Sequence, residues 1–323
     1  MTLAATNMTD SRFAVVMPIY EDQEASTRLF RELSAEYGDR VYVVAVDDGS
    51  IHQPVQIEAL QSTGLNGVVI QLKRNVGHQR AIAIGINYVA DHFPDMPCTV
   101  VMDSDGEDTP QSIRELVAPM QSTNIDVVVA QRKSRVETFR FKAFYLIYKL
   151  LFQFLTGRKI SFGNFMALKP AALKRLAAMQ ELWMHVASCV LTSKLRVQTL
   201  PIDRGPRYAG KSKMNFVGLA LHGFRALMVF AEDVLVRVGI ICAFVAVITV
   251  IASCVAIALK LAGFATPGWF SVALGILLLV FLQTGALTLM TLMLTGVVRA
   301  GAPNQIDYNA YIERVEHTKK YAL

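Results

Sequence analysis

The stretch from Val238 to Val298 restricts the fold of this chain more than any other part, because Lys260 is its one charged residue. Val238 to Leu259 is 22 residues long, and about 20 apolar residues cross the hydrocarbon core of a bilayer. The segment 260–269, which contains glycine and proline, separates it from a second apolar run, Phe270 to Val298. The sequence therefore predicts a hairpin of two transmembrane helices, 238–259 and 270–298, the second long enough to tilt.

Basic residues flank the open ends of this predicted hairpin. Arg237 precedes the first span and Arg299 follows the second, whereas the turn between the spans holds only Lys260. Further basic residues on the side of the open ends are Arg225, Arg314, Lys319 and Lys320. Loops rich in lysine and arginine stay on the cytoplasmic side of a membrane. We therefore expect both termini and the polar part of the chain to be cytoplasmic.

The second predicted span carries small and polar side chains, which let helices approach closely and bond to one another in a membrane. These residues are Gln283, Thr284, Thr288, Thr291, Gly275, Gly285 and Gly296. We expect one face of this span to pack against another helix, either of this chain or of a second protomer in a homo-oligomer.

The composition indicates a polar domain attached to the membrane segment. Of 323 residues, 53% are hydrophobic and 18% are charged. Lysine and arginine number 32 against 26 acidic residues, which favours anionic partners such as lipid head groups and nucleotides. No basic stripe with interleaved aromatic residues points to nucleic acid. The four cysteines lack C-x-x-C spacing, so neither zinc nor a disulfide framework is expected. Residues 1–12 are polar, and we expect a flexible terminus without a secretory signal.

Five apolar runs before residue 215 alternate with segments of helical spacing. The runs are Phe13–Met17, Val41–Val46, Val68–Leu72, Thr99–Met102 and Asp126–Ala130. Unbroken hydrophobic strands that alternate with helices are typical of a parallel sheet covered on both faces. Polar residues follow successive strands, so we expect them to converge at the carboxyl edge of the sheet, where such folds bind ligands.

One acidic segment follows the fourth of these runs. Its carboxylates are Asp103, Asp105, Glu107 and Asp108. Carboxylates this close repel one another, and Mg²⁺ or Mn²⁺ prefers such oxygen ligands together with phosphates. We interpret Asp103 and Asp105 as a site for a metal ion and a diphosphate. The alternative is a polar turn that caps the next helix, with Asp108 or Thr109 as the N-cap and Pro110 at the first helical position. Both interpretations can hold together.

Five motifs in order resemble the family 2 glycosyltransferases. They are V-V-M-P-I-Y-E-D, V-D-D-G-S, R-N-V-G-H-Q-R-A-I-A-I-G, D-S-D-G-E-D-T-P and A-Q-R-K-S-R, within about 120 residues. They are most similar to the polyprenyl-phosphate type, the dolichyl-phosphate mannose synthases and bacterial undecaprenyl-phosphate sugar transferases. The resemblance implies an α/β GT-A fold over residues 13–215, a nucleotide-sugar donor, a divalent metal and inversion at the anomeric carbon.

The resemblance also implies roles for individual residues. Donor nucleotide binding falls on Pro18, Tyr20, Asp22, Asp47, Asp48, Arg74, Asn75, Asp103 and Glu107. The metal ligands would be Asp103 and Asp105, and the catalytic set would be Asp103, Asp105, Asp108, Arg132 and Arg135. For the segment Asp47–Ser50 alone, an ordinary β-turn is the alternative. Glu107 replaces the glutamine of the family, and it could add a metal ligand or alter the choice of donor.

The acceptor side departs from the family pattern. Relatives often carry aspartate where this chain has Ser161, and aspartate or glycine where it has Asn164. A carboxylate that could act as a general base is therefore missing there. A lipid phosphate is already anionic at neutral pH and needs no base, so the departure favours a phosphate acceptor. Asp108, Glu107 or His185 could serve as a base instead, although a structural histidine is the favoured interpretation of His185.

Basic and amphipathic segments complete the prediction. The loop Arg204–Lys213 resembles the R-x-x-G-x-S-K segment of the family. Acceptor phosphate binding is expected from Arg135, Asn164, Arg207, Ser212 and Lys213, the alternative for the loop being a solvated basic turn. Residues 139–155 are expected to form an interfacial helix, with an ordinary core helix as the alternative. Residues 216–237 are expected to form a juxtamembrane helix, and 299–323 a cytoplasmic tail.

These features together predict an inverting, metal-dependent glycosyltransferase. It would transfer a sugar from a nucleotide-sugar, in particular a UDP-sugar, to undecaprenyl phosphate at the cytoplasmic face of a bacterial inner membrane, with Mg²⁺ or Mn²⁺. The first alternative is a transferase that acts on another lipid or on a growing polysaccharide, but the Q-x-x-R-W segment typical of those enzymes is not visible. The second alternative is a catalytically silent scaffold with the same fold.

Overall fold

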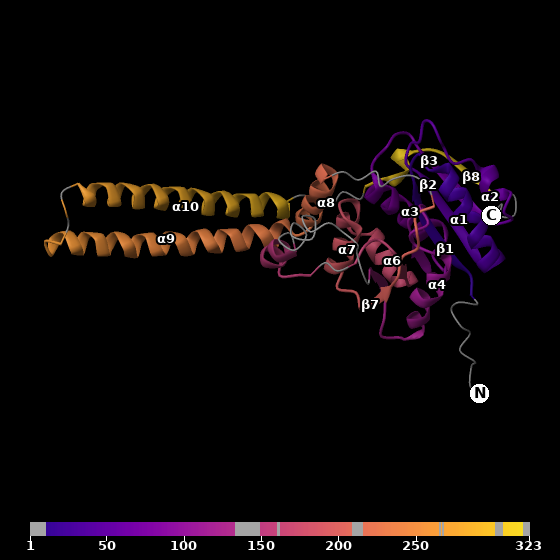
Figure 1. Ribbon diagram of the computed structural model, residues 1–323, viewed down its shortest axis with the longest axis horizontal. Helices are drawn as coiled ribbons and strands as arrows, with labels where there is room; N and C mark the ends of the chain where they lie inside the picture. The colour runs from indigo at the N-terminus through magenta and orange to yellow at the C-terminus, as the bar shows by residue number, and fades with distance from the viewer. Residues whose placement is uncertain are drawn as a thin grey trace. The chain divides into compact units, whose positions relative to one another are not determined.

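The computed structural model describes residues 11–132, 149–159, 162–208, 216–264, 266, 268–300 and 306–318. The chain divides into two compact units (Figure 1). The first consists of Met1–Ala143, Ile160–Val229 and Gln305–Leu323, and the second of Phe144–Lys159 and Phe230–Asn304. The predicted site residues Arg135, Ser212 and Lys213 lie outside the described residues, as do Ser161 and residues 139–148 of the predicted interfacial helix.

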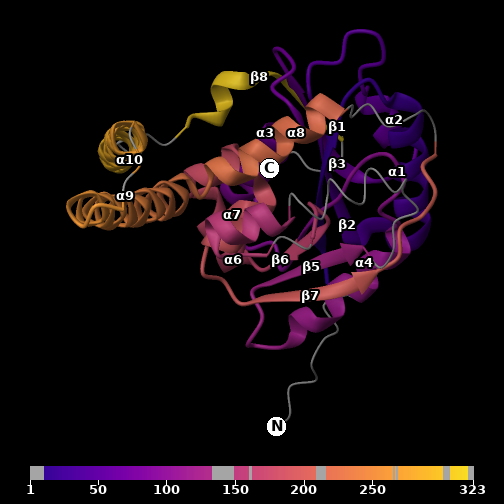
Figure 2. The same cartoon turned by 60° about the vertical axis from the view of Figure 1, so that its left-hand side comes forward.

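The first unit is built on one mixed sheet. Within the described residues it has eight strands in the order β7-β5-β6-β4-β1-β2-β3-β8. They are β1 (Phe13–Ile19), β2 (Val41–Asp47), β3 (Asn66–Leu72), β4 (Thr99–Val101), β5 (Val127–Arg132), β6 (Met166–Leu168), β7 (Val197–Ile202) and β8 (Ile312–His317). β1 pairs in parallel with β2 and β4, and β2 with β3. β5 and β7 are also parallel and lie side by side (Figure 2), whereas β6 is antiparallel to both β4 and β5.

Helices cover both faces of this sheet. They are α1 (Gln23–Tyr37), α2 (Ile57–Gln61), α3 (His78–His92), α4 (Pro110–Val117), α6 (Pro170–Ala177) and α7 (Val186–Thr192). A further helix, α8 (Phe216–Met228), contacts α7, where the hydroxyl of Ser188 donates to the carbonyl of Ala226 at 3.3 Å. Short 3-10 turns occur at Gly38–Arg40, Ala118–Gln121, Gln180–Trp183 and Tyr308–Tyr311.

Alternate strand residues enter two separate cores. Val16 and Val44 pack with α3, α6 and α7 on one face, while Val15 and Val43 pack with α1, α2 and α4 on the other. Helix α3 approaches the sheet so closely that a Cβ on Gly85 would lie 2.4 Å from Cγ1 of Val16. The unbroken valine runs thus become strands that are buried on both faces, as the sequence predicts.

Strand β8 lies in the segment 299–323, which was predicted from the sequence to be a cytoplasmic tail. β8 follows the apolar hairpin in the sequence and pairs antiparallel with β3, with Ile70 opposite Val315. The backbone N–H of Thr318 also donates to the carbonyl of Gly67 at 3.0 Å. Part of the segment 299–323 is therefore an edge strand of the sheet.

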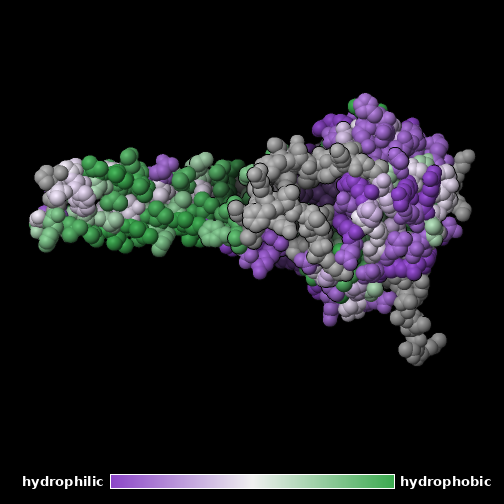
Figure 3. All heavy atoms as spheres, in the orientation of Figure 1, coloured by the Kyte–Doolittle hydropathy of each residue, from purple (hydrophilic) through white to green (hydrophobic). Residues whose placement is uncertain are grey.

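The second unit holds two long helices, α9 (Ala231–Leu261) and α10 (Trp269–Ala300), which pack against each other. At one close approach, a Cβ on Gly239 would lie 2.9 Å from Oγ1 of Thr291. Both helices are long and apolar enough to cross a membrane, and hydrophobic side chains cover them (Figure 3). Residues 149–155 of the predicted interfacial helix are helical, and the helix continues to Thr156. The predicted helix 216–237 is divided, because α8 ends at Met228 and α9 begins at Ala231.

Candidate active site

The loops that carry the motifs meet at the carboxyl ends of β1, β2 and β4. Ile19 lies opposite Asp47 in the parallel pairing, and the backbone N–H of Asp48 donates to the carbonyl of Ile19 at 2.8 Å. The backbone N–H of Met102, after β4, donates to the carbonyl of Val16 at 3.1 Å. The structure therefore brings the loops that follow these three strands to one edge of the sheet.

Asp47 and Asp48 are both buried, and their carboxylates hold backbone groups. Asp47 accepts hydrogen bonds from the backbone N–H groups of Ser50 at 2.8 Å and Val55 at 2.7 Å. Asp48 accepts from Val76 at 2.7 Å and Gly77 at 2.9 Å. Each of the four carboxylate oxygens therefore orders a loop, which goes further than the simple β-turn alternative.

The loop after β2 also needs a glycine to contact the loop after β3. Gly49 has a φ of 70°, and a Cβ there would lie 2.5 Å from the carbonyl carbon of Arg74 and 2.7 Å from the nitrogen of Asn75. Only glycine adopts this conformation without strain and leaves this space. The motifs V-D-D-G-S and R-N-V-G-H thus form one packed structure, which positions Arg74 and Asn75.

His78 begins α3 directly after this structure and reaches the acidic segment. Its Nε2 lies 3.3 Å from Oδ1 of Asp103 and 3.1 Å from Nδ2 of Asn164. Burial is the largest single influence and would lower the pKa of His78, but the charge and hydrogen bond of Asp103, together with the charges of Asp48 and Asp105, raise it overall. His78 was not among the predicted site residues, although its place in the R-N-V-G-H motif, directly before a helix, could have indicated it.

The acidic segment after β4 folds back on itself. The backbone N–H of Asp103 donates to Oδ2 of Asp108 at 3.1 Å, and the N–H of Glu107 donates to Oδ1 of Asp105 at 3.0 Å. Thr109 occupies the N-cap position of α4, and Pro110 is the first helical residue. The segment therefore forms the turn before a helix, as the alternative interpretation states, and also gathers its carboxylates.

Two arginines from the loop after β7 neutralise these carboxylates. Arg204 forms ion pairs with Glu107, with Asp108 (3.2 Å) and with Asp103 (3.9 Å). Arg207 forms ion pairs with Asp105 (2.5 Å) and Glu107 (3.5 Å). Arg207 was predicted to bind an acceptor phosphate, and the structure places it on Asp105. Arg204 was not in the predicted site set.

Backbone contacts fix this arginine loop onto the acidic segment. The N–H of Gly205 donates to the carbonyl of Glu107 at 2.9 Å, and the N–H of Tyr208 donates to that of Asp105 at 3.0 Å. A Cβ on Gly106 would lie 2.5 Å from the ring of Tyr208, so the ring occupies the space that a larger residue would need. The tyrosine hydroxyl also bonds to Glu32 of α1.

Burial and mutual repulsion change the protonation of these acids. Burial raises the pKa of Asp108, and the nearby charge of Asp103 raises it further. Burial and the charge of Asp103 likewise raise the pKa of Asp105. Asp48 is affected mainly by burial, which raises its pKa to about 6 against its two backbone hydrogen bonds. The site therefore holds more carboxyl groups than can easily be ionised at the same time.

The donor set fits a divalent metal ion that shares its ligands with a substrate. Asp103 and Asp105 provide carboxylate oxygens, which Mg²⁺ and Mn²⁺ prefer. Among the described residues, no three side chains of His, Cys, Asp or Glu are placed to hold a metal by themselves. A metal here would rely on two carboxylates and on phosphate oxygens, which is the usual arrangement for Mg²⁺ beside a nucleotide.

A small cavity opens beside Asp108. It is lined by Asp108, Ala130, Gly163, Phe165, Ile202, Asp203 and Arg204. Arg132, at the end of β5, lies opposite Ile202 in the strand pairing. The predicted acceptor segment, the end of β5 and the arginine loop therefore border one hollow next to the acidic segment.

The remaining predicted donor residues lie on β1 and the loop after it. Pro18 is buried within β1, Tyr20 is 42% exposed, and Asp22 is the N-cap residue of α1. Between them, Glu21 accepts hydrogen bonds from three consecutive N–H groups, those of Ile51, His52 and Gln53. Glu21 was not predicted as a site residue. It ties the loop after β1 to the loop after β2.

His185 is structural in this fold. It is 3% exposed, its Nδ1 accepts from the backbone N–H of Ser188 at 3.1 Å, and its Nε2 lies 3.1 Å from Nε2 of His222. Burial, with a smaller contribution from His222, lowers its pKa to about 3. These contacts support the structural interpretation of His185 over a role as general base.

The chain is similar to glycosyltransferases of one family. A family model described as "Glycosyl transferase family 2" matches residues 14–183. Undecaprenyl-phosphate 4-deoxy-4-formamido-L-arabinose transferase of Edwardsiella ictaluri is 28% identical over 214 residues, which cover 64% of each chain. The protein of the same name from an Enterobacter species is 28% identical over 216 residues, also 64% of each chain. The alignments thus span less than two thirds of these relatives.

Among solved structures, the chain is similar to a glucosyl-3-phosphoglycerate synthase. The enzyme from Mycobacterium tuberculosis, in complex with Mn²⁺, UDP and phosphoglyceric acid, matches with a TM-score of 0.51 and 13% identity. The match covers 72% of this chain and 80% of that chain. At this identity the similarity concerns the fold alone, and it confirms the predicted GT-A architecture.

Proposed function

This chain belongs to glycosyl transferase family 2, and from that premise we propose that it transfers a sugar from a nucleotide-sugar to undecaprenyl phosphate. The acidic segment and its two arginines at the sheet edge carry the proposal. The names of the two relatives support the acceptor. A UDP-sugar is the proposed donor.

On the donor side, the roles follow from the position of each group. Asp103 and Asp105 would hold Mg²⁺ or Mn²⁺, which when bound would supply positive charge for the departing nucleoside diphosphate. Arg204 and Arg207 add guanidinium groups, which bind phosphate oxygens well. Asp108 accepts from the backbone N–H of Asp103, so we assign it the role of orienting that residue rather than of removing a proton.

On the acceptor side, the chemistry requires positioning more than proton removal. A phosphate monoester is anionic at neutral pH, and its oxygen can attack the anomeric carbon from the face opposite the leaving group, which inverts the configuration. His78 lies beside Asp103, and Asn164 contacts His78. We assign them, together with Arg132 and the predicted Arg135, Ser212 and Lys213, to the two sets of phosphates.

The hairpin supports an acceptor that is a lipid. Helices α9 and α10 would keep the catalytic unit at the membrane surface, where the phosphate of a polyprenyl lipid lies. The basic residues at the open ends of the hairpin favour the cytoplasmic face of a bacterial inner membrane. The hydrocarbon tail then stays in the bilayer, and only the phosphate needs to enter the site.

Incubation of the purified full-length protein with undecaprenyl phosphate, Mn²⁺ and a panel of nucleotide sugars tests this proposal. Mass spectrometry of the lipid extract should show one glycosyl group added to the phosphate of undecaprenyl phosphate, with release of the nucleoside diphosphate. Product on a diacylglycerol or an oligosaccharide acceptor, with none on the polyprenyl phosphate, would favour the first alternative. No transfer and no hydrolysis of any donor would favour the scaffold.

A further inference from the structure

The two arginines of one loop are held very differently. Arg204 contacts three carboxylates, its side chain is 20% exposed, and the adjacent Gly205 is bonded to the carbonyl of Glu107. A Cβ on Gly205 would lie 2.7 Å from Cγ2 of Thr109, so this part of the loop has little freedom. Arg207 contacts two carboxylates through a single nitrogen, Nη2. It therefore has fewer contacts to lose.

The contact of Arg207 falls on the oxygen that a metal ion would need. Oδ1 of Asp105 already accepts from the backbone N–H of Glu107 at 3.0 Å, and Oδ2 lies 2.5 Å from Nη2 of Arg207. A divalent cation and a guanidinium group cannot both sit close to Oδ2, because like charges at that distance repel strongly. A diphosphate, by contrast, offers the guanidinium group several anionic oxygens.

We propose that Arg207 is an exchangeable counter-ion of Asp105, which moves to the diphosphate of the donor when a metal ion takes its place, while Arg204 stays. This inference rests on the proposed function for the identity of its ligands. Metal ion and nucleotide then bind cooperatively, because the diphosphate removes the competitor of the metal. The coupling is reciprocal, so each ligand tightens the other by the same factor.

Glu107 would keep Arg207 close to the site after Arg207 leaves Asp105. Oε1 of Glu107 lies 3.5 Å from Nη2 of Arg207, while its other oxygen, Oε2, pairs with Arg204. A glutamine, which the family pattern has at this position, would lack the negative charge that attracts both guanidinium groups. Glu107 is thus a positioning residue for Arg207. Its replacement should affect the coupling between ligands and not only turnover.

The test is a measurement of Mn²⁺ binding to the full-length protein in detergent, with and without UDP, by electron paramagnetic resonance of free Mn²⁺. Removing the competitor in Arg207→Gln should tighten Mn²⁺ binding without UDP about tenfold and reduce the effect of UDP by about the same factor. Glu107→Gln should also weaken the coupling. Arg196→Gln, which alters an ion pair on the exposed surface, is the matched control and should change neither quantity.

The outcome that overturns the exchange is an Arg207→Gln variant whose Mn²⁺ affinity without UDP equals or falls below that of the wild type, with its melting temperature unchanged. Arg207→Lys keeps the positive charge and should still compete with the metal. It therefore shows whether the effect of Arg207→Gln comes from the lost charge or from altered folding. If Mn²⁺ binds and sugar is transferred but Arg207→Gln changes nothing, the exchange fails and the proposed function stands. If Mn²⁺ and UDP are coupled as expected but no sugar is transferred from any donor, the exchange stands and the proposed function fails.

Discussion

Two acidic pairs occupy the same edge of the sheet and are used in opposite ways. Asp47 and Asp48, at the carboxyl end of β2, accept hydrogen bonds only from backbone N–H groups among the contacts described above. Asp103 and Asp105, after β4, face the charged side chains His78, Arg204 and Arg207. Backbone donors cannot leave without unfolding a loop, whereas side chains can rotate away. The first pair therefore builds the site, and the second pair is free to exchange partners with a ligand.

The first acidic pair should therefore contribute mainly to stability, and the second mainly to ligand binding, although both follow a strand in the same way. A carboxylate that orders two backbone groups should affect folding and activity together. Replacing a carboxylate that lies among other carboxylates should reduce activity but cost little stability, because the replacement also relieves the repulsion between like charges. The comparison is therefore tested by measuring the free energy of unfolding beside turnover.

The largest expected effect on stability follows from Asp48→Asn. The amide oxygen could still accept from one of the two backbone N–H groups, but the amide nitrogen would face the other. This leaves two donors without an acceptor, and each unsatisfied buried group costs roughly 1–3 kcal/mol. We expect a loss of about 3 kcal/mol in the free energy of unfolding and a drop of several degrees in melting temperature. Thermal denaturation in detergent measures it. The matched variant Asp105→Asn should melt within about 2 °C of the wild type, and an equal drop for both would remove the distinction.

Arg204→Gln should have the next largest effect. It leaves Asp103, Glu107 and Asp108 without their shared counter-ion, and breaking a buried ion pair is strongly destabilising. Because the side chain of Arg204 is 20% exposed, solvent reduces the loss to about 2 kcal/mol. Chemical denaturation measures it against Arg207→Gln, which should lose less than half as much. A larger loss for Arg207→Gln would reverse the roles assigned to the two arginines.

A pH series isolates Asp48 from the other titrating groups. Its pKa is raised to about 6 in the folded protein from an ordinary value of 3.8, so between pH 3.8 and about pH 6 the folded state holds a proton that the unfolded state releases. Its contribution to stability is thus fully present below pH 3.8 and is lost as the pH rises through 6. The difference in unfolding free energy between wild type and Asp48→Asn should grow by about 1 kcal/mol from pH 7 to pH 5. A constant difference would contradict the assignment.

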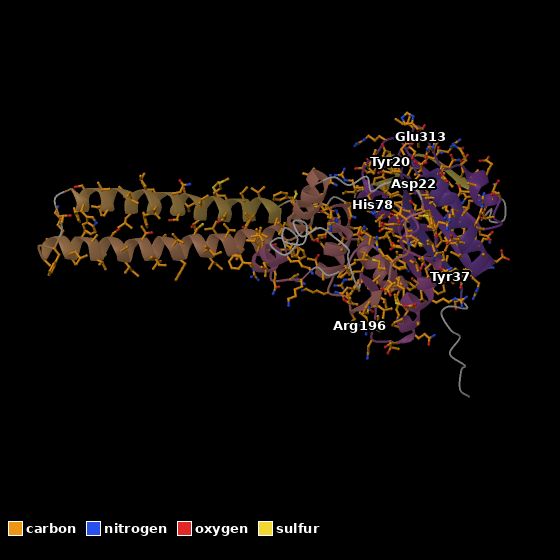
Figure 4. The ribbon with its side chains drawn as sticks, viewed as in Figure 1. Tyr20, Asp22, Tyr37, His78, Arg196 and Glu313 are labelled. Carbon is orange, nitrogen blue, oxygen red and sulfur yellow. The ribbon has the colours of Figure 1, made fainter. Side chains whose placement is uncertain are left out.

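The smallest effect is expected at Arg196, which lies on the domain away from His78 (Figure 4). Arg196 pairs with Asp126 at 2.6 Å, and its side chain is 55% exposed. Exposed pairs contribute about 0–1 kcal/mol, so Arg196→Gln should lose less than 1 kcal/mol on unfolding and keep full turnover. A loss as large as that of Arg204→Gln would show that exposure does not separate the two kinds of arginine.

The sequence predicts the strands and the edge at which their polar ends meet, because unbroken valine runs have few alternatives. It does not distinguish the two acidic pairs, since an aspartate that orders a loop and one that binds a ligand follow a strand in the same way. The difference depends on partners far along the chain, such as Val76 for Asp48 and Arg204 for Asp103. No local pattern reports such pairings.

The other features missed by sequence analysis have similar causes. β8 is a six-residue strand with four charged or histidine side chains, so its sequence reads as a polar tail until β3 provides a partner. The division of the segment 216–237 after Met228 has no proline or glycine to mark it. His78 contacts Asp103 only because Asp48 holds the loop before α3.

The most direct test of the account is the yield of lipid-linked sugar phosphate from the double variant Asp103→Asn, Asp105→Asn, measured by mass spectrometry beside the wild type in the same detergent. The account predicts that turnover falls by at least about 1000-fold, while the melting temperature stays close to that of the wild type. A folded double variant that makes the product at a rate near that of the wild type would contradict it.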